Sequence, residues 1–304
     1  MSQDKRKADR TAMGVAMWRA LGAREGDARV RNPDFMAAEF LDPVSRALLA
    51  VAPVRAWFKS HFGRKLPGAY GFATARTLHL DSLFLQALGE GVRQVVLLGA
   101  GYDSRAYRFR ERLGGARVFE VDLPSTQQRK KERLGALLGS MPDWVTYVPI
   151  DFDKQRLEEV LPGAGFDSRL RTFFLWEGVC MYLSEEGVQQ TLGFVVRNAP
   201  PGSSIAFDYV ALGALRGDVR YPDSRQWGSA LAAMGHPMTF GIEEDESEAY
   251  LRQQGLELVS RIGSADMERA YLTKSNGELL CHTSNILNIV HARVAGPGGV
   301  ASTP

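Results

Sequence analysis

The spacing of apolar residues changes close to Gln94, and the change separates two kinds of predicted structure. Residues 11–90 contain no predicted strand, and their apolar residues recur at helical spacing. The last helix of this part is predicted over residues 71–88, where Leu80, Phe84 and Leu88 share one face before a glycine-rich end. We therefore expect several helices to precede the first strand.

From Gln94 onward, short apolar runs alternate with helical patterns. This alternation is typical of a mostly parallel sheet that carries helices on both faces. The predicted fold class is α/β, with a Rossmann-like seven-stranded mostly parallel sheet, an N-terminal helical extension and a lid-like insertion. The seven predicted strands are 94–98, 116–121, 145–149, 171–177, 203–209, 256–262 and 281–291.

Helix signals follow several of these strands. Pro124 stands at a suitable first position for a helix that ends at Leu138, and an acidic first turn predicts a second helix over residues 153–161. Ser184 precedes a third helix, in which Val188 and Leu192 share one face. Each predicted helix therefore connects two strands.

Residues 211–247 interrupt this regular pattern with scattered glycine and proline residues and one helical piece at 224–234. Such a segment is either a surface elaboration or a lid over a substrate site, and the sequence favours neither. The tail at residues 296–304 is small and polar, which predicts disorder. We expect a helical extension over residues 1–90 and a core over residues 91–295.

A glycine turn follows the first predicted strand. Gly99, Ala100 and Gly101 come directly after the apolar run, and glycine suits a backbone of positive φ that a ligand approaches closely. Ser104 stands where a G-x-G-x-x-G pattern would carry its third glycine. The turn therefore fits a nucleoside without a pyrophosphate better than a dinucleotide, and S-adenosyl-L-methionine (SAM) is such a ligand.

Acidic residues end the second and third predicted strands. Asp122 lies 21 residues after Gly101, where this fold presents a carboxylate to ribose hydroxyls. Glu120 shares its face of the strand, but only Asp122 is near enough to the carboxyl end to reach the site. Asp151 can bind an adenine amino group while Phe152 covers the ring. Helix capping is the alternative role for both aspartates.

Glu177 ends the very apolar fourth strand, so its charge must find a partner or suffer a desolvation cost. We expect it to face the ammonium or sulfonium group of a ligand. The alternative is a buried ion pair with an arginine. Tyr182 follows five residues later and can direct its hydroxyl into the same pocket, although a tyrosine judged alone is more often a packing residue.

Composition limits the function further. With 45% hydrophobic residues, 24% charged residues and a net charge of +2, the chain has the profile of a globular protein with little attraction for nucleic acid. No apolar stretch approaches the ~20 residues of a membrane span. Two widely separated cysteines, Cys180 and Cys281, favour a reducing, cytoplasmic location. The histidines lack metal-ligand spacing, so no metal is expected.

Four ordered segments resemble the leucine carboxyl methyltransferase family of SAM-dependent O-methyltransferases. The resemblance spans roughly residues 70–210, and the family includes bacterial enzymes of natural-product pathways. It implies SAM as the cofactor, S-adenosyl-L-homocysteine as its product and a small molecule as the acceptor. The four segments are QVVLLGAGYDSRAYRF (94–109), VFEVDLPSTQQRKKERL (118–134), YVPIDF (147–152) and FLWEGVCMYL (174–183).

The resemblance also implies roles for single residues around the cofactor. Gly99 and Gly101 line the methionine portion of SAM, and Asp122 holds the ribose. Asp151 and Phe152 bound the adenine.

Three further residues are similar to family residues at the reacting end of the cofactor. Glu177 resembles the acid near the methionine end. Arg76 resembles the arginine that contacts the SAM carboxylate and the acceptor carboxylate, and Tyr182 resembles its tyrosine neighbour. We can place the segments before residue 60 and over residues 211–247 against nothing in the family. The identity of the acceptor is expected to depend on these segments, so it is not identified.

The expected reaction is methyl transfer to an oxygen atom, with a carboxylate as the preferred acceptor. A carboxylate is ionised at pH 7, so it needs only Arg76 and Tyr182 to aim it. A phenol or enol hydroxyl would need a base, for which His79 and His236 are candidates. The glycine turn is also compatible with an NAD(P)-dependent oxidoreductase and with a non-catalytic nucleoside-binding protein. The sequence does not determine the oligomeric state.

Overall fold

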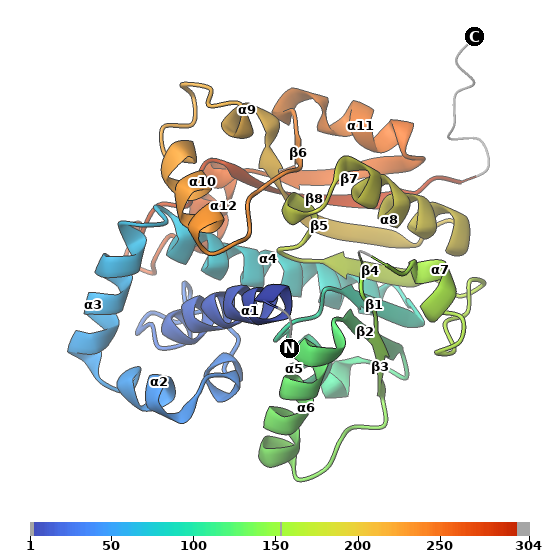
Figure 1. Ribbon diagram of the computed structural model, residues 1–304, viewed down its shortest axis with the longest axis horizontal. Coiled ribbons are helices and arrows are strands. Elements are labelled where there is room, and N and C mark those ends of the chain that lie inside the picture. Colours follow the sequence, from blue (N-terminus) through green and yellow to red (C-terminus); the bar gives the residue numbers. More distant parts are fainter. Residues whose placement is uncertain (1–2, 153, 297–304) are drawn as a thin grey trace.

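A sheet of eight strands forms the centre of the computed structural model, which describes residues 3–152 and 154–296 (Figure 1). The strand order is β3-β2-β1-β4-β5-β8-β7, and β6 pairs with β5 off this path. Strands β1 to β5 run parallel, whereas β8 is antiparallel to both β5 and β7. The strands are β1 (Gln94–Leu98), β2 (Arg117–Asp122), β3 (Val145–Pro149), β4 (Thr172–Trp176), β5 (Ser204–Ala211), β6 (Gly241–Ile242), β7 (Leu256–Ile262) and β8 (Leu287–Val294).

Helices cover both faces of this sheet and continue beyond it at the N-terminal side (Figure 1). The helices before β1 are α1 (Gln3–Gly22), the 3-10 helix η1 (Ala37–Phe40), α2 (Pro43–Leu48), α3 (Ala52–Gly63) and α4 (Ala69–Gly89). Those after it are α5 (Arg105–Arg108), η2 (Arg110–Arg112), α6 (Pro124–Leu138), α7 (Leu157–Val160), η3 (Cys180–Tyr182), α8 (Glu185–Asn198), α9 (Leu212–Leu215), α10 (Ser224–Ala233), η4 (Glu244–Glu246), α11 (Ser247–Gln253) and α12 (Ser264–Tyr271). No helix in the described part of the chain is long and apolar enough to cross a membrane.

The central strands are buried on both faces. In β4, Phe173 packs into the hydrophobic cluster on one side of the sheet and Phe174 into the cluster on the other. In β1, Val95 and Val96 alternate in the same way, because successive side chains of a strand point to opposite faces. Both faces are covered, so these strands are continuous apolar runs in the sequence.

Most predicted elements are confirmed to within a few residues, and α6 has the predicted bounds. The strand predicted over 281–291 begins later, at Leu287. The residues before it lie against the start of α4 instead of a neighbouring strand: a Cβ on Gly71 would be 2.5 Å from the carbonyl oxygen of His282, and one on Gly68 would be 2.1 Å from the nitrogen of Ser284.

Two other predictions need correction. The helix predicted over 153–161 is only α7, because Lys154 and Gln155 donate their backbone N–H groups to the carbonyl oxygen of Asp151 and form a turn first. The eighth strand, β6, was not predicted because two residues show no periodicity. Gly241 allows this pairing, since a Cβ there would lie 2.7 Å from the carbonyl oxygen of Val210.

The division into extension, core and tail stays a prediction. Residues 297–304 of the predicted disordered tail lie outside the described residues. The insertion at 211–247 contains α9, α10, β6 and η4, and it follows β5 at the carboxyl edge of the parallel strands.

Candidate functional site

The glycine turn after β1 has the backbone that the sequence predicts. Gly99 has φ +66° and Gly101 has φ +44°, which is the left-handed region. A Cβ on Gly99 would also lie 2.4 Å from Cγ2 of Val179. The backbone N–H groups of Gly99 and Ala100 both donate to the carbonyl oxygen of Val121 in β2, at 2.8 and 3.0 Å, so the turn is held against the neighbouring strand.

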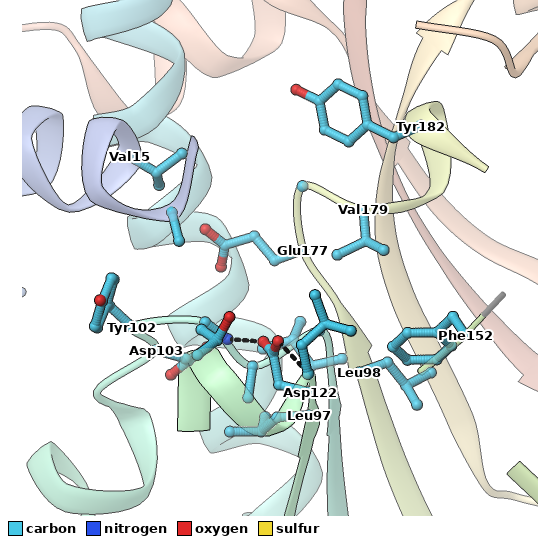
Figure 2. A pocket seen from close by; sticks show the side chains of 18 of the residues that line it. Val15, Leu97, Leu98, Tyr102, Asp103, Asp122, Phe152, Glu177, Val179 and Tyr182 are labelled. Carbon is cyan, nitrogen blue, oxygen red and sulfur yellow. Dashed lines mark hydrogen bonds between the residues drawn. The ribbon is translucent and has the colours of Figure 1, made fainter. Parts of the chain in front are cut away.

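A cavity of about 500 Å³ opens at this turn, at the carboxyl ends of the parallel strands. Figure 2 shows side chains from the strand ends and from α1 around it. The residues predicted to bind the cofactor or to orient a carboxylate acceptor all line this cavity: Arg76, Gly99, Ala100, Gly101, Asp122, Asp151, Phe152, Glu177 and Tyr182.

The two acidic residues of β2 have different surroundings. Asp122 lines the cavity, and its carboxylate accepts hydrogen bonds from the N–H groups of Gly101 at 2.5 Å and Leu123 at 2.6 Å (Figure 2). Burial raises the pKa of Asp122, while these two donors favour its charged form. Glu120 is fully buried away from the cavity and pairs with Lys130 at 2.8 Å. The choice of Asp122 over Glu120 therefore agrees with the geometry.

Helix capping does not explain either aspartate. Leu123 is the N-cap of α6, and Arg156 is the N-cap of α7. Asp151 instead faces Lys154 at 3.0 Å and lines the cavity beside Phe152, whose ring is half-buried. A carboxylate and an aromatic face are therefore available together at the end of β3.

Glu177 lies between two arginines. Its Oε1 is 3.0 Å from Nε of Arg76, and its Oε2 accepts a hydrogen bond from Nη1 of Arg105 at 2.8 Å. Burial alone would raise its pKa, but the two guanidinium groups outweigh burial and lower the pKa of Glu177 to about 2. The sequence left two roles open for Glu177, and the structure contains the ion pair while the residue also lines the cavity.

Arg105 and Asp208 extend this ion-pair network, and neither was predicted from the sequence. Arg105 is fully buried and also contacts Asp81 and Asp103. Asp208 in β5 accepts hydrogen bonds from Nη1 of Arg76 and from the backbone N–H of Gly178, both at 2.6 Å. Asp208 is a charged residue in an apolar strand, so the criterion that identified Glu177 applies to it as well.

One wall of the cavity comes from η3 and the insertion. The rings of Tyr182 and His236 are 5.8 Å apart, edge to face, and both residues line the cavity. Burial raises the pKa of Tyr182 to about 12, so its hydroxyl stays protonated at neutral pH. His79 does not line the cavity: its Nδ1 pairs with the hydroxyl of Tyr271 at 2.8 Å. His79 is therefore wrong as a candidate base.

Helix α1 forms another wall that the sequence did not predict. Ala12, Val15 and Arg19 all line the cavity, and Figure 2 shows Val15 on the side facing Glu177. We recognised no family motif in the segment before residue 60, so the sequence offered no reason to place α1 at the site. Among the described residues, no group of three or more His, Cys, Asp or Glu could hold a metal ion.

Comparison with known proteins identifies the family. The model of the leucine carboxyl methyltransferase family matches residues 12–196, so the expectation that the segment before residue 60 lies outside the family is wrong. A Bacillus subtilis protein named as a SAM-dependent methyltransferase is 29% identical over 218 residues, which are 72% of this chain and 71% of that protein. A similarly named protein of Mycobacterium sp. strain KMS is 31% identical over 265 residues, or 83% of this chain and 82% of its own length.

Solved structures show the same fold at lower identity. A crystal structure of a Thermobifida fusca protein described as a methyltransferase matches with a TM-score of 0.56 and 17% identity, covering 93% of this chain and 94% of its own. A Streptomyces avermitilis protein matches with a TM-score of 0.57 and 17% identity, covering 80% of this chain and 91% of its own.

The expected fold class, family and cofactor are thereby confirmed, and the comparisons support a SAM-dependent methyltransferase. With its glycine turn, acidic strand ends and matched family model, the chain belongs to the leucine carboxyl methyltransferase family of SAM-dependent methyltransferases.

Proposed function

We propose that this methyltransferase transfers the methyl group of SAM to an oxygen atom of a small-molecule acceptor, and that the acceptor group is a carboxylate. The observation that carries the proposal is that Arg76 and a protonated Tyr182 line the same cavity. Both side chains are hydrogen-bond donors at neutral pH, so they can hold an anion but cannot remove a proton.

The residues at the strand ends fit the cofactor. The carboxylate of Asp122 accepts the backbone N–H groups of Gly101 and Leu123, and its four lone pairs leave room to accept a ribose hydroxyl as well. Asp151 and Phe152 offer an acceptor and an aromatic face to adenine. Gly99 and Gly101 keep the turn free of side chains at the methionine end. When bound, SAM supplies a methyl group made electrophilic by a sulfonium.

Arg76 is well placed to orient an acceptor. Glu177 and Asp208 fix the guanidinium from two directions, and no described residue accepts a hydrogen bond from its Nη2. A carboxylate is already ionised at pH 7, so the role of Arg76 and Tyr182 is to aim one oxygen at the methyl group. Exclusion of water assists them, since a positive donor and an anionic acceptor lose their charges together.

A hydroxyl acceptor is the second candidate, and His236 favours it. Its Nε2 is buried and has no hydrogen-bond partner among the described residues, beside the ring of Tyr182. A neutral imidazole in this place could take the proton of a phenol or enol. With His79 paired to Tyr271 away from the cavity, His236 is the candidate base that remains.

The test uses SAM labelled in the methyl group and a panel of small carboxylic acids and phenols, natural products included. We expect labelled products whose label is released as methanol by alkali, because methyl esters hydrolyse and aryl methyl ethers do not. Tyr182→Phe should lower kcat/KM roughly tenfold to a hundredfold, the value of one hydrogen bond to a charged group. Tyr271→Phe is the matched control, because its hydroxyl lies off the cavity.

Alkali-stable label, with activity that is lost in His236→Gln, would instead establish the hydroxyl acceptor. Cofactor binding is checked separately by calorimetry with S-adenosyl-L-homocysteine. Asp122→Ala should weaken it roughly tenfold to a hundredfold, because a charged hydrogen-bond acceptor is removed. Binding without turnover on any acceptor would support a non-catalytic nucleoside-binding protein.

A further inference from the structure

Helices α2 and α3 meet in a corner at the outer rim of the molecule, away from the sheet (Figure 1). We call residues 43–65 the α2–α3 corner. Arg55 joins the two helices, because its Nη1 donates to the carbonyl oxygens of Leu49 and Ala50 at the end of α2, both at 2.9 Å. The two helices therefore present their outer side chains as one surface.

The α2–α3 corner exposes apolar side chains. Neither α2 nor α3 contains a buried residue, although both are rich in apolar ones. Val44 is 68% exposed and Trp57 is 56% exposed, and Leu48 and Val51 are exposed as well. The ring of Trp57 stacks on that of His61, with 4.9 Å between the ring centroids. Large apolar side chains gathered in one exposed region indicate a binding surface, whereas scattered ones do not.

The same corner is strongly basic. Residues 43–65 contain five Lys and Arg residues and no Asp or Glu, whereas the whole chain has a net charge of only +2. Two of the five pair with acids that lie outside the corner. Arg55, Arg64 and Lys65 form no ion pair with any described residue. Much of the positive charge of the corner is therefore uncompensated, and it lies among the exposed apolar side chains.

This charge limits what the corner can bind. Two copies of the chain packed through it about a twofold axis would place like charges opposite one another. An acidic protein would satisfy the charges, but it would also need an apolar groove that matches the corner. A membrane surface with anionic lipids needs no such groove: its headgroups attract the basic residues, and its acyl boundary accepts the apolar ones. Tryptophan is enriched at that boundary.

We propose that the α2–α3 corner binds reversibly to the surface of a membrane that contains anionic lipids. Trp57 and its aliphatic neighbours enter the interfacial region, and Arg64 and Lys65 lie at the headgroup phosphates. No residue of the corner lines the cavity at the glycine turn. Membrane binding can therefore be measured without reference to the cofactor or the acceptor, and it does not rest on the proposed function.

The experiment is sedimentation of the full chain with lipid vesicles. One set of vesicles contains phosphatidylcholine alone, and the other contains phosphatidylcholine mixed with phosphatidylglycerol, which is anionic. We expect the protein to sediment with the mixed vesicles and to stay in solution with the neutral ones. Added salt should release it, because salt screens the attraction between basic residues and headgroups.

Variants of the corner separate its two contributions. Arg64→Gln combined with Lys65→Gln should weaken binding to the mixed vesicles roughly thirtyfold, at about fivefold for each basic residue near an anionic surface. The matched control combines Arg93→Gln with Arg112→Gln, which removes the same charge from exposed positions outside the corner and should leave binding almost unchanged.

Trp57→Ala should weaken binding roughly tenfold, because a large apolar side chain no longer enters the interface. Leu137→Ala is its control, since Leu137 is exposed on α6 and lies outside the corner. Circular dichroism shows whether each variant is folded. If Trp57→Ala does not fold, the charge variant and its control still test the proposal.

Failure of the wild type to bind the mixed vesicles would overturn the proposal, as would equal weakening in the charge variant and its control. Salt-sensitive binding to polyglutamate without binding to vesicles would assign the corner to an acidic protein instead. A dimer in analytical ultracentrifugation that Trp57→Ala dissociates, again without vesicle binding, would assign it to a second copy of the chain. Both results would also refute membrane binding.

Discussion

Buried titratable groups have charged partners in the parallel half of the sheet, whereas a buried histidine in the antiparallel half has none among the described residues. At the carboxyl ends of the parallel strands, buried acids and arginines form a connected network through Glu177 and Arg76. In the antiparallel half, His291 on β8 is buried with 6% exposed, and its Nε2 has no hydrogen-bond partner among the described residues. Its ring instead lies 6.2 Å from that of Phe173.

Similar burial therefore has different consequences for charge. Guanidinium partners lower the pKa of Glu177 to about 2, so its carboxylate stays ionised at neutral pH. Burial, assisted by the charge of Arg293, lowers the pKa of His291 to about 4, so its imidazole stays neutral. Charge is kept where a polar ligand is expected and is avoided where only the core is packed.

The largest effect should come from breaking the network. Glu177→Gln leaves two buried guanidinium groups without their shared carboxylate, and we expect it to lower the free energy of unfolding by about 3–5 kcal/mol. Chemical denaturation at pH 7 measures this. Glu278→Gln is the control, because its pair with Lys274 is exposed and should contribute little. Equal losses in both variants would show that the network is no more important than a surface pair.

The next prediction concerns how the stability of the protein depends on pH through His291 in the antiparallel half. The unfolded chain protonates His291 near pH 6.5, whereas the folded chain does so only near 4. Between these values the unfolded state binds more protons, so stability is full above pH 6.5 and falls as the pH drops towards 4, by about 3 kcal/mol in total. His291→Phe should remove this component.

Denaturation of His291→Phe and the wild type at several pH values between 4 and 7 gives the comparison. The difference in free energy of unfolding between the two proteins should change across this interval in favour of the variant at low pH. A difference that stays constant with pH would mean that His291 titrates normally in the folded protein.

A smaller loss of stability is expected when a turn glycine in either half of the sheet is replaced by alanine. Gly101 has φ +44° before α5, and Gly255 has φ +82° before β7. Alanine at either position must adopt a left-handed backbone, which costs about 1–2 kcal/mol. Both variants should therefore unfold at lower temperature, but only Gly101→Ala should weaken binding of S-adenosyl-L-homocysteine. Weaker binding in Gly255→Ala as well would mean that the loss reflects stability rather than the site.

Much of the site could be predicted because its signals are local. Strand β1 and the turn at Gly99 follow from an apolar run and two glycines, and Asp122 follows from its place at a strand end. The carboxyl ends of parallel strands meet at one edge, so residues far apart in sequence could be assigned to one cavity without knowing their contacts.

Errors arose where a long-range contact decides the role. His79 has the chemistry of a base, but its partner is Tyr271, almost two hundred residues away. Arg19 belongs to a helix in which we recognised no motif, and the packing of α1 over the glycine turn brings it to the cavity. Ala12 on the same helix shows this packing, with its Cβ 3.6 Å from the position of a Cβ on Gly101.

The sequence alone determined the α/β class, the alternation of strands and helices along the chain, the glycine turn and the acidic strand ends. These features could be predicted because periodicity and turn chemistry depend on neighbouring residues. Only the tertiary structure decided which charges pair, which histidine reaches the cavity and which helix closes it. Those properties depend on distances between distant segments, and the energy of a buried charge is set by whichever partner the fold brings within a few ångströms.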